Sequence, residues 1–196
     1  MNSTIKFYEN NADIFIQDTL NKQMEIQYKR FEKYLFHKAH ILDAGCGSGR
    51  DSIYFKNKAY QVTAIDASKK MCNFAKDLLL QDVEQLRFEE MKYSNAFDAI
   101  WASASLLHIP KRHMGDILKR FAQALNPQGI LYASFKLEDK EYMKDNRFFN
   151  SYTEESFSKL IDTVPFTLKE MYTLEDTRLD KKGEFWLNVL LTVNKS

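Results

Sequence analysis

A glycine-rich segment and a downstream acid are the residues of this chain best suited to hold a ligand. The segment Asp43-Ala-Gly-Cys-Gly-Ser-Gly49 lies between a predicted strand and a predicted helix. Gly45 and Gly47 allow the backbone to approach a ligand without Cβ collisions, and free amides at the following helix start can face polar groups. Asp66 ends the next predicted strand, where an acid can accept both ribose hydroxyls of a nucleoside. The pattern therefore predicts a nucleoside site rather than a bare strand-to-helix turn.

The spacing of the glycines distinguishes two kinds of nucleoside cofactor. Dinucleotide sites carry Gly-x-Gly-x-x-Gly, whereas residues 45–49 read Gly-x-Gly-x-Gly and follow Asp43. This pattern, with a strand-end acid downstream, resembles the first two motifs of class I S-adenosylmethionine-dependent methyltransferases. The resemblance implies S-adenosylmethionine as the cofactor and transfer of its methyl group as the reaction.

The same resemblance implies how individual residues would hold this cofactor. The glycine loop would lie under the methionine and the ribose, Asp43 would order the loop and contact the methionine ammonium, and Asp66 would bind the ribose. The loop after a third strand would flank the adenine. The residues expected at the cofactor are Tyr8, Asp43, Ala44, Gly45, Cys46, Gly47, Arg50, Asp66, Ala67, Met71, Glu89, Glu90, Met91 and Ser103.

A closer resemblance extends over nearly the whole chain. The matching runs resemble a group of small bacterial methyltransferases often described as tellurite-resistance-like, and they occupy residues 47–52, 97–108, 132–136, 173–178 and 184–188. Two positions depart from the group: Ala99 and Ala102 stand where Gly and Cys are common. Both changes are small and leave the expected chemistry unaltered.

Several of these positions also have a purely structural interpretation. His108 follows the predicted fourth strand, where a ring with a pKa near ~6.5 can act as a general base or can be hydrogen-bonded into the fold. Tyr8 resembles the N-terminal tyrosine that closes over the cofactor in this group, or it packs in a helical core. Arg50 reaches the methionine carboxylate or the substrate, or it forms an ion pair. Glu89 and Glu90 accept from the adenine amino group, or they are solvated.

Polar and aromatic residues after the fourth strand and near the C-terminus form a candidate substrate site. Trp186 taken alone fits a core position better than a stacking role, but the resemblance favours the group as a whole. The candidate substrate residues are Ser105, Arg147, Tyr152, Asp176, Arg178 and Trp186.

Composition places the chain among ordinary globular proteins. It has 196 residues, of which 44% are hydrophobic and 28% charged, and its formal net charge is +1. No stretch approaches the ~20 apolar residues that cross a bilayer, and the N-terminus has no apolar signal-peptide core, so we expect a cytoplasmic protein without a membrane partner. Two cysteines are too few for a disulfide framework, and the four histidines show no metal-site spacing.

Hydrophobic patterning alternates strands and helices, which indicates an α/β domain with a mainly parallel sheet. Residues 126–129 fit a type I turn, residues 137–152 a loop or cap, and residues 180–183 the turn of a closing hairpin. The predicted strands are 40–45, 61–66, 86–89, 97–103, 130–135, 166–173 and 184–193.

These elements predict a Rossmann-like fold of the class I methyltransferase type. We expect a seven-stranded, mainly parallel sheet with a C-terminal antiparallel hairpin and helices on both faces. The whole of residues 1–196 would form one domain: an N-terminal helical cap over 1–39, a cofactor-binding core over 40–136, and a C-terminal cap with closing strands over 137–196.

The acceptor is constrained by the chemistry of a sulfonium methyl donor. Transfer needs an aligned nucleophile about 3 Å from the methyl carbon, and a base is needed for alcohols or amines. Thiolates and reduced selenium or tellurium anions need no base, which suits a chain whose candidate base is one histidine. We expect a small-molecule acceptor, with oxygen, nitrogen, sulfur or another chalcogen as nucleophile, and either a monomer or a homodimer.

Two other functions remain open. Residues 106–110, Leu-Leu-His-Ile-Pro, also resemble tRNA wobble-uridine methyltransferases, but a nucleic-acid partner is disfavoured because phosphate contacts require clustered basic residues and no long basic run is present. A non-catalytic module that only binds S-adenosylmethionine is the second alternative.

Overall fold

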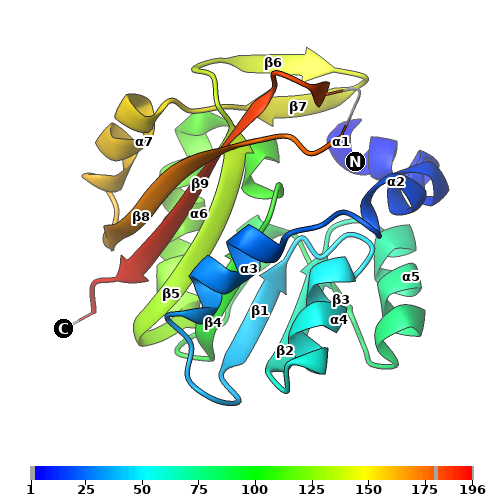
Figure 1. The fold of residues 1–196 in the computed structure, drawn as a ribbon, viewed down its shortest axis with the longest axis horizontal. Coiled ribbons are helices and arrows are strands. Elements are labelled where there is room, and N and C mark those ends of the chain that lie inside the picture. Colours follow the sequence, from blue (N-terminus) through cyan, green and yellow to red (C-terminus); the bar gives the residue numbers. More distant parts are fainter. Residues whose placement is uncertain (1–2, 179–180, 196) are drawn as a thin grey trace.

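A seven-stranded sheet forms the centre of the molecule in the computed structural model, which describes residues 3–178 and 181–195 (Figure 1). Its strand order is β3-β2-β1-β4-β5-β9-β8. The first five strands pair in parallel, and β9 pairs antiparallel with both β5 and β8. The predicted fold class is thereby confirmed. The strands are β1 (His40–Ala44), β2 (Gln61–Asp66), β3 (Glu84–Gln85), β4 (Phe97–Ala102), β5 (Leu125–Lys136), β8 (Phe166–Glu175) and β9 (Phe185–Val193).

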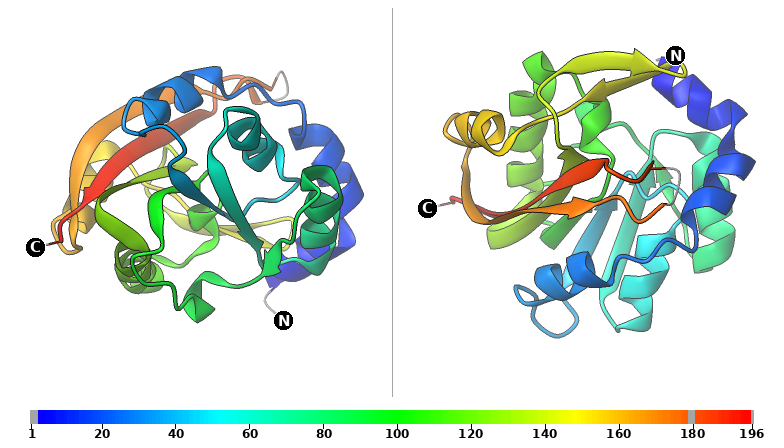
Figure 2. Two further views of the ribbon diagram at one scale, coloured as in Figure 1. Left: turned by 90° about the horizontal axis from the view of Figure 1, so that it is seen from below. Right: turned by 45° about the horizontal axis from the view of Figure 1, so that its top comes forward.

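Helices cover both faces of this sheet (Figures 1 and 2). One face carries α3 (Glu25–Glu32), α4 (Arg50–Asn57) and α5 (Lys69–Leu79), and the other carries α6 (Lys111–Ala124) and α7 (Glu154–Ile161). Two short helices, α1 (Ser3–Asn10) and α2 (Ala12–Thr19), lie beyond the ends of the strands. The described residues before β1 therefore form three short helices, of which α3 lies on a face of the sheet.

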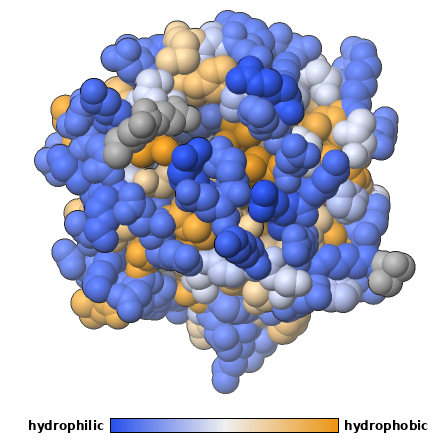
Figure 3. All heavy atoms as spheres, turned by 180° about the vertical axis from the view of Figure 1, so that it is seen from behind, coloured by the Kyte–Doolittle hydropathy of each residue, from blue (hydrophilic) through white to orange (hydrophobic). Residues whose placement is uncertain are grey.

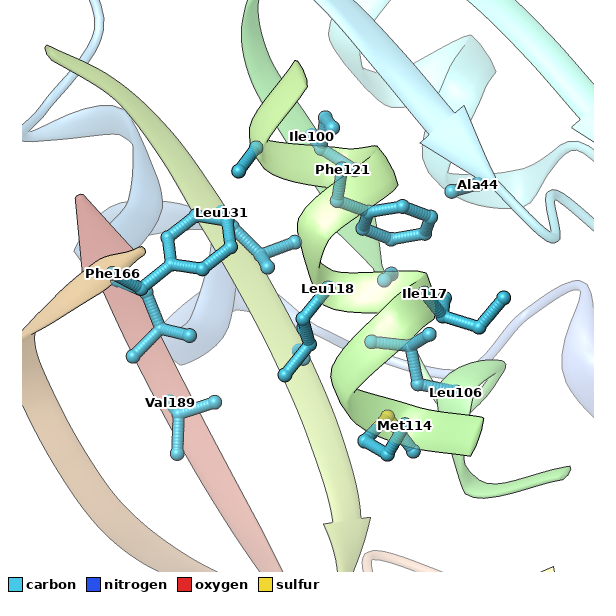
Figure 4. Close-up of a cluster of buried hydrophobic side chains, with 14 of the residues drawn as sticks. Ala44, Ile100, Leu106, Met114, Ile117, Leu118, Phe121, Leu131, Phe166 and Val189 are labelled. Carbon is cyan, nitrogen blue, oxygen red and sulfur yellow. The ribbon is translucent and has the colours of Figure 1, made fainter. Parts of the chain in front are cut away.

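Alternation along the strands sends apolar side chains to both faces. In β1, Ile41 packs with the aromatic cluster under α3 and α4, whereas its neighbour Leu42 packs under α6. On the α6 face, Leu118 lies on the side of Leu131 of β5, and Phe121 points toward Ala44 of β1 (Figure 4). Since successive strand residues point to opposite faces, a strand buried on both sides reads as the nearly continuous apolar run seen in the sequence.

Side-chain caps fix where two of the helices begin. The Ser68 hydroxyl accepts the Met71 amide at 3.3 Å before α5, and the Thr153 hydroxyl accepts the Ser156 amide at 3.2 Å before α7. Each cap satisfies an amide that the first helical turn leaves unpaired. The cap at Ser68 directly follows Asp66 and Ala67, so it also sets the geometry of the strand end.

Two local predictions were wrong. The third strand occupies 84–85 rather than 86–89, because Leu86 and Phe88 leave the sheet edge to pack against the core, and residues 88–90 form the short helix η1 (Phe88–Glu90). Residues 126–129 do not form a type I turn: Gln128 has a φ of +63°, whereas that turn needs a negative φ there. These residues bulge out of β5. Phe97 of β4 pairs with Leu125, but Ala99, two residues later, pairs with Ile130, which is five residues later in β5.

The segment expected to be a loop or cap contains a hairpin. Residues 137–152 include β6 (Glu141–Lys144) and β7 (Arg147–Asn150), an antiparallel pair separate from the main sheet. The hairpin lies across the end of the molecule near α1 (Figure 1). The closing pair β8 and β9 is confirmed, although part of its predicted turn, Asp180, lies outside the described residues.

No helix within 3–178 or 181–195 has both the length and the apolar character needed to cross a bilayer. The face opposite to that of Figure 1 is mostly polar, with apolar residues in small patches (Figure 3), as is usual for exposed protein surface.

Candidate functional site

A cavity of about 350 Å³ lies at the carboxyl ends of the parallel strands. The strand order reverses between β1 and β4, and open α/β sheets bind ligands in the crevice outside such a switch point. The cavity is covered by α1 and by the β6–β7 hairpin, which are joined where the Phe148 amide donates to the Thr4 hydroxyl at 2.9 Å. The fold therefore places a partly covered cavity where the sequence predicts a ligand.

Most of the residues predicted at the site surround this cavity. Those that line it are Tyr8, Gly45, Cys46, Gly47, Arg50, Asp66, Ala67, Met71, Glu89, Ser103, Ser105, His108, Arg147, Arg178 and Trp186. The predicted residues outside the described lining are Asp43, Ala44, Glu90, Met91, Tyr152 and Asp176. Contact of any of these residues with a ligand stays a prediction.

The glycine loop is held tightly against the end of β2. The amides of Gly45 and Cys46 both donate to the Ile65 carbonyl at 2.9 Å. Gly45 has a φ of +81°, and a Cβ built there would lie 2.5 Å from the Cβ of Ser105, whose hydroxyl donates to the Ala44 carbonyl at 2.7 Å. Glycine is therefore required at position 45 both by backbone conformation and by the close approach of the loop after β4.

The loop after β4 is fixed from a second side. Ala104 adopts a left-handed conformation with a φ of +51°, and its amide donates to the Ser134 hydroxyl of β5 at 2.9 Å. This contact sets the path of Ser103 and Ser105 along the cavity wall. Two neighbouring strands thus determine where the polar groups after β4 lie.

Asp66 presents a preorganised carboxylate at the end of β2. One of its oxygens accepts the Gly47 amide at 2.9 Å and the other accepts the Ser68 amide at 2.8 Å. Burial raises the pKa of this carboxyl, while the backbone hydrogen bonds oppose the shift. Because each carboxylate oxygen can accept more than one hydrogen bond, both remain able to receive the hydroxyls of a ribose.

Asp43 lies behind the loop rather than on the cavity wall. It is 2% exposed and accepts the Ser52 hydroxyl of α4 at 2.6 Å. Burial, together with the nearby charge of Asp51, raises the pKa of Asp43 to about 8. Its position suits the predicted role of ordering the glycine loop, and it does not put the carboxyl among the described lining residues.

A buried carboxylate under the loop fixes the orientation of Arg50. Asp51 accepts the Tyr28 hydroxyl at 2.5 Å and the Trp101 indole Nε1 at 2.7 Å. The Arg50 guanidinium donates to the two oxygens of Asp51 at 2.6 and 2.8 Å. Arg50 therefore makes an ion pair, which is one of the two interpretations of its position in the sequence, and it also lines the cavity. Sequence patterns could not indicate the Asp51 network, because its partners come from distant parts of the chain.

His108 is fully paired and neutral. Its Nδ1 lies 2.6 Å from the Phe148 carbonyl, which can only accept, so Nδ1 carries the proton. Nε2 lies 2.8 Å from the Tyr8 hydroxyl and therefore accepts from it. Burial lowers the pKa of His108 to about 4. The single lone pair of the neutral ring is thus occupied, which supports the structural interpretation of His108 in this conformation.

The wall expected to flank adenine is formed by residues that follow β3. Leu86, Phe88 and Glu89 line the cavity there. Glu90 instead accepts the Arg87 amide at 3.2 Å, and Met91 is buried in the core. The apolar residues at 86 and 88 were missed as site residues because they were assigned to a strand.

The C-terminal cap is organised around a second buried carboxylate. Asp176 accepts the Arg178 guanidinium at 2.7 and 3.0 Å and the Trp186 indole at 2.8 Å. Burial opposes its ionisation, but these hydrogen bonds outweigh burial and hold the pKa of Asp176 well below its usual range. Lys136 and Lys22 also face it at 3.4 and 3.7 Å. Asp176 therefore positions the side chains that reach the cavity.

Other lining residues were not anticipated from the sequence. Tyr152 packs against Phe135 and Phe157 in the core instead of reaching the cavity. Alternate polar positions in the apolar strand β5 were the available signal for part of the missed set, because residues two apart share one face. The missed lining residues include Phe15, Lys22, Ser134, Lys136, Tyr142 and Phe149.

Comparison with known families identifies the central part of the chain. Residues 41–129 match the family model described as "Methyltransferase domain". An uncharacterized methyltransferase of Staphylococcus carnosus is 25% identical over 153 residues, which cover 78% of this chain and 72% of the relative. A ubiquinone biosynthesis O-methyltransferase of Xanthomonas oryzae is 32% identical over 106 residues, covering 49% of this chain and 42% of that protein.

Solved structures share the fold over almost the whole chain. A Burkholderia thailandensis 1,6-didemethyltoxoflavin-N1-methyltransferase, crystallised with 1,6-didemethyltoxoflavin and S-adenosylhomocysteine, has a TM-score of 0.79. The two chains are 22% identical, and the alignment covers 97% of this chain and 85% of the other. The likeness extends beyond the glycine loop to the closing strands.

Proposed function

We propose that this chain, which is a class I S-adenosylmethionine-dependent methyltransferase, transfers the methyl group to a small-molecule nucleophile inside the capped cavity. The observation that carries this proposal is that α1 and the β6–β7 hairpin cover one side of the site, whose cavity has a volume of about 350 Å³. Small-molecule sites in proteins typically span roughly 300–1,000 Å³. Relatives named for ubiquinone biosynthesis and for 1,6-didemethyltoxoflavin support the same class of acceptor.

The cofactor would lie across the ends of β2, β1 and β4. Asp66 would accept the ribose hydroxyls, and Gly45 and Gly47 would pass beneath the ribose and methionine. The wall formed by Leu86 and Phe88 would contact the adenine. Arg50, whose orientation Asp51 fixes, would donate a charge-assisted hydrogen bond to the methionine carboxylate.

The transfer itself requires alignment more than proton removal. The nucleophile attacks the methyl carbon in line with the sulfur; the new bond to carbon forms as the carbon–sulfur bond breaks, and the sulfur keeps the electron pair. Such alignment alone can supply much of the rate acceleration. His108 is the only histidine among the described lining residues, and its paired ring favours an acceptor that arrives already ionised.

Acceptors of this kind include thiolates, carboxylates, acidic enols and reduced selenium or tellurium anions. The reduced selenium and tellurium anions agree with the resemblance to the tellurite-resistance-like group. An alcohol or amine acceptor would need a base that accepts its proton, and it would require the Tyr8–His108 pair to open first.

A methyl-transfer screen with labelled S-adenosylmethionine tests the proposal. The acceptors should include thiols, carboxylic acids, reduced selenite and tellurite, and total tRNA. We expect label in at least one small molecule and none in RNA. Label in tRNA would instead establish modified-base methylation, and tight S-adenosylhomocysteine binding without turnover of any acceptor would support a binding module.

A further inference from the structure

We infer that Arg147 binds a carboxylate of the acceptor, which makes small carboxylic acids the substrate class of this enzyme. This inference rests on the proposed function, because it assigns the acceptor that the cavity receives. Arg147 begins β7 and lines the cavity from the hairpin side.

The surroundings of Arg147 hold its guanidinium in place, with the Tyr8 hydroxyl and Asp145 beside it, but they leave its Nε unpaired. The guanidinium carbon lies 4.3 Å from the ring centre of Phe7 and 5.2 Å from that of Phe149. Aromatic faces attract a cation but offer no conventional hydrogen-bond acceptor. The Nε atom is buried and makes no hydrogen bond to any described residue. A buried donor of this kind calls for a partner that the protein itself does not supply.

Among the described residues, the one acid that pairs with Arg147 is a weak competitor for it. Asp145 lies 3.3 Å from the Arg147 Nη2 atom, and its side chain is 62% exposed. Exposed ion pairs contribute little because water screens them. An entering carboxylate can therefore take the buried Nε and a neighbouring nitrogen together, in the forked geometry that a guanidinium favours.

The charges of the cavity wall point to the same class of ligand. The chain as a whole has a formal charge of +1, yet its described lining contains more basic than acidic side chains. S-adenosylmethionine adds a further positive charge, since its sulfonium and ammonium outnumber its carboxylate. The basic lining residues are Lys22, Arg50, Arg87, Lys136, Lys144, Arg147, Arg178 and Lys181, and the acidic ones are Asp51, Asp66, Glu89, Asp145 and Glu184.

Arg147 also lies next in sequence to a residue that pairs with His108, the candidate general base. The next residue, Phe148, supplies the carbonyl that fixes Nδ1 of His108, and the hydroxyl of Tyr8 fixes Nε2. A carboxylic acid is ionised near neutral pH without any base. A cationic wall beside a blocked histidine therefore suits this acceptor class better than an alcohol or an amine.

Ligand binding to the protein saturated with S-adenosylhomocysteine tests this inference. The probes are three matched pairs at equal ionic strength: propionate and propionamide, benzoate and benzamide, succinate and succinamide. We expect at least one carboxylate to bind at least tenfold more tightly than its amide, by calorimetry. Arg147→Gln should remove that preference, whereas Arg147→Lys should keep part of it because the charge remains but the fork is lost.

A matched control removes a positive charge from the same hairpin region. Lys140 is exposed, pairs with Glu138 and does not belong to the described lining, so Lys140→Gln should leave the preference unchanged. Circular dichroism and S-adenosylhomocysteine affinity, both unchanged in Arg147→Gln, would show that the variant is folded and that its cofactor site is intact.

Three results would overturn the assignment. In the first, the wild type binds no carboxylate more tightly than its amide. In the second, the Arg147→Gln variant keeps the preference. In the third, the Arg147→Gln variant loses S-adenosylhomocysteine affinity, which would make Arg147 a cofactor residue. Failure of the wild type to bind S-adenosylhomocysteine at all would count against the proposed function instead, so the two failures are distinguishable.

Discussion

Replacing Gly45 by alanine should destabilise the protein by about 2–3 kcal/mol. A left-handed conformation costs a residue with a Cβ about 1–2 kcal/mol, and Gly45 has a φ of +81°. The new Cβ would also lie 2.5 Å from the Cβ of Ser105, so that residue must move. Its hydrogen bond to the Ala44 carbonyl, worth roughly 0.5–1.5 kcal/mol, is then weakened.

A second glycine of the same chain provides the control. Gly115 lies inside α6, and a Cβ built there meets nothing within 4 Å. Because alanine favours a helix interior over glycine by about 0.5–1 kcal/mol, Gly115→Ala should raise the stability. Urea denaturation of both variants measures the difference. A Gly45→Ala variant within about 0.5 kcal/mol of wild type, the usual range for surface changes, would refute the reasoning.

Two further variants test the electrostatics of the site. His108→Asn should leave cofactor affinity nearly intact. The pH profile of wild-type turnover should show no inflection near about 6.5. An inflection there that the variant abolishes would show that His108 is the base. Burial raises the pKa of Asp43 to about 8, so the folded protein holds an extra proton between the unfolded value of about 3.9 and that pH. Stability should therefore fall as pH rises through this window, and Asp43→Asn should flatten the fall in Tm. If the slope of Tm against pH were the same in Asp43→Asn and wild type, the raised pKa of Asp43 would be contradicted.

The parts of the fold that local chemistry determines were predictable from the sequence. The buried runs of β1 and β4 are apolar on both faces, and the glycine loop needs positive φ at positions that only glycine tolerates easily. Ser68 and Thr153 mark helix starts by a cap that acts over three residues. Each of these signals depends on neighbours in the sequence.

What depended on distant partners could not be predicted. The role of Asp51 is set by Tyr28 and Trp101, which come from α3 and β4. The sequence left both interpretations of His108 open, because its partner, the Phe148 carbonyl, lies 40 residues further along the chain. The hairpin that carries Phe148 was itself missed, because two short strands rich in polar residues lack a clear apolar alternation.

The account rests most directly on the binding of the cofactor to Asp66. Isothermal titration of S-adenosylhomocysteine should show binding to the wild type and a loss of more than roughly tenfold, or 1.4 kcal/mol, in Asp66→Ala, because two ribose hydrogen bonds to a charged group are removed. Asp77→Ala, at an exposed position of α5 outside the described lining, should bind like wild type. Equal affinity of Asp66→Ala and wild type would contradict the placement of the ribose and, with it, the reading of the cavity.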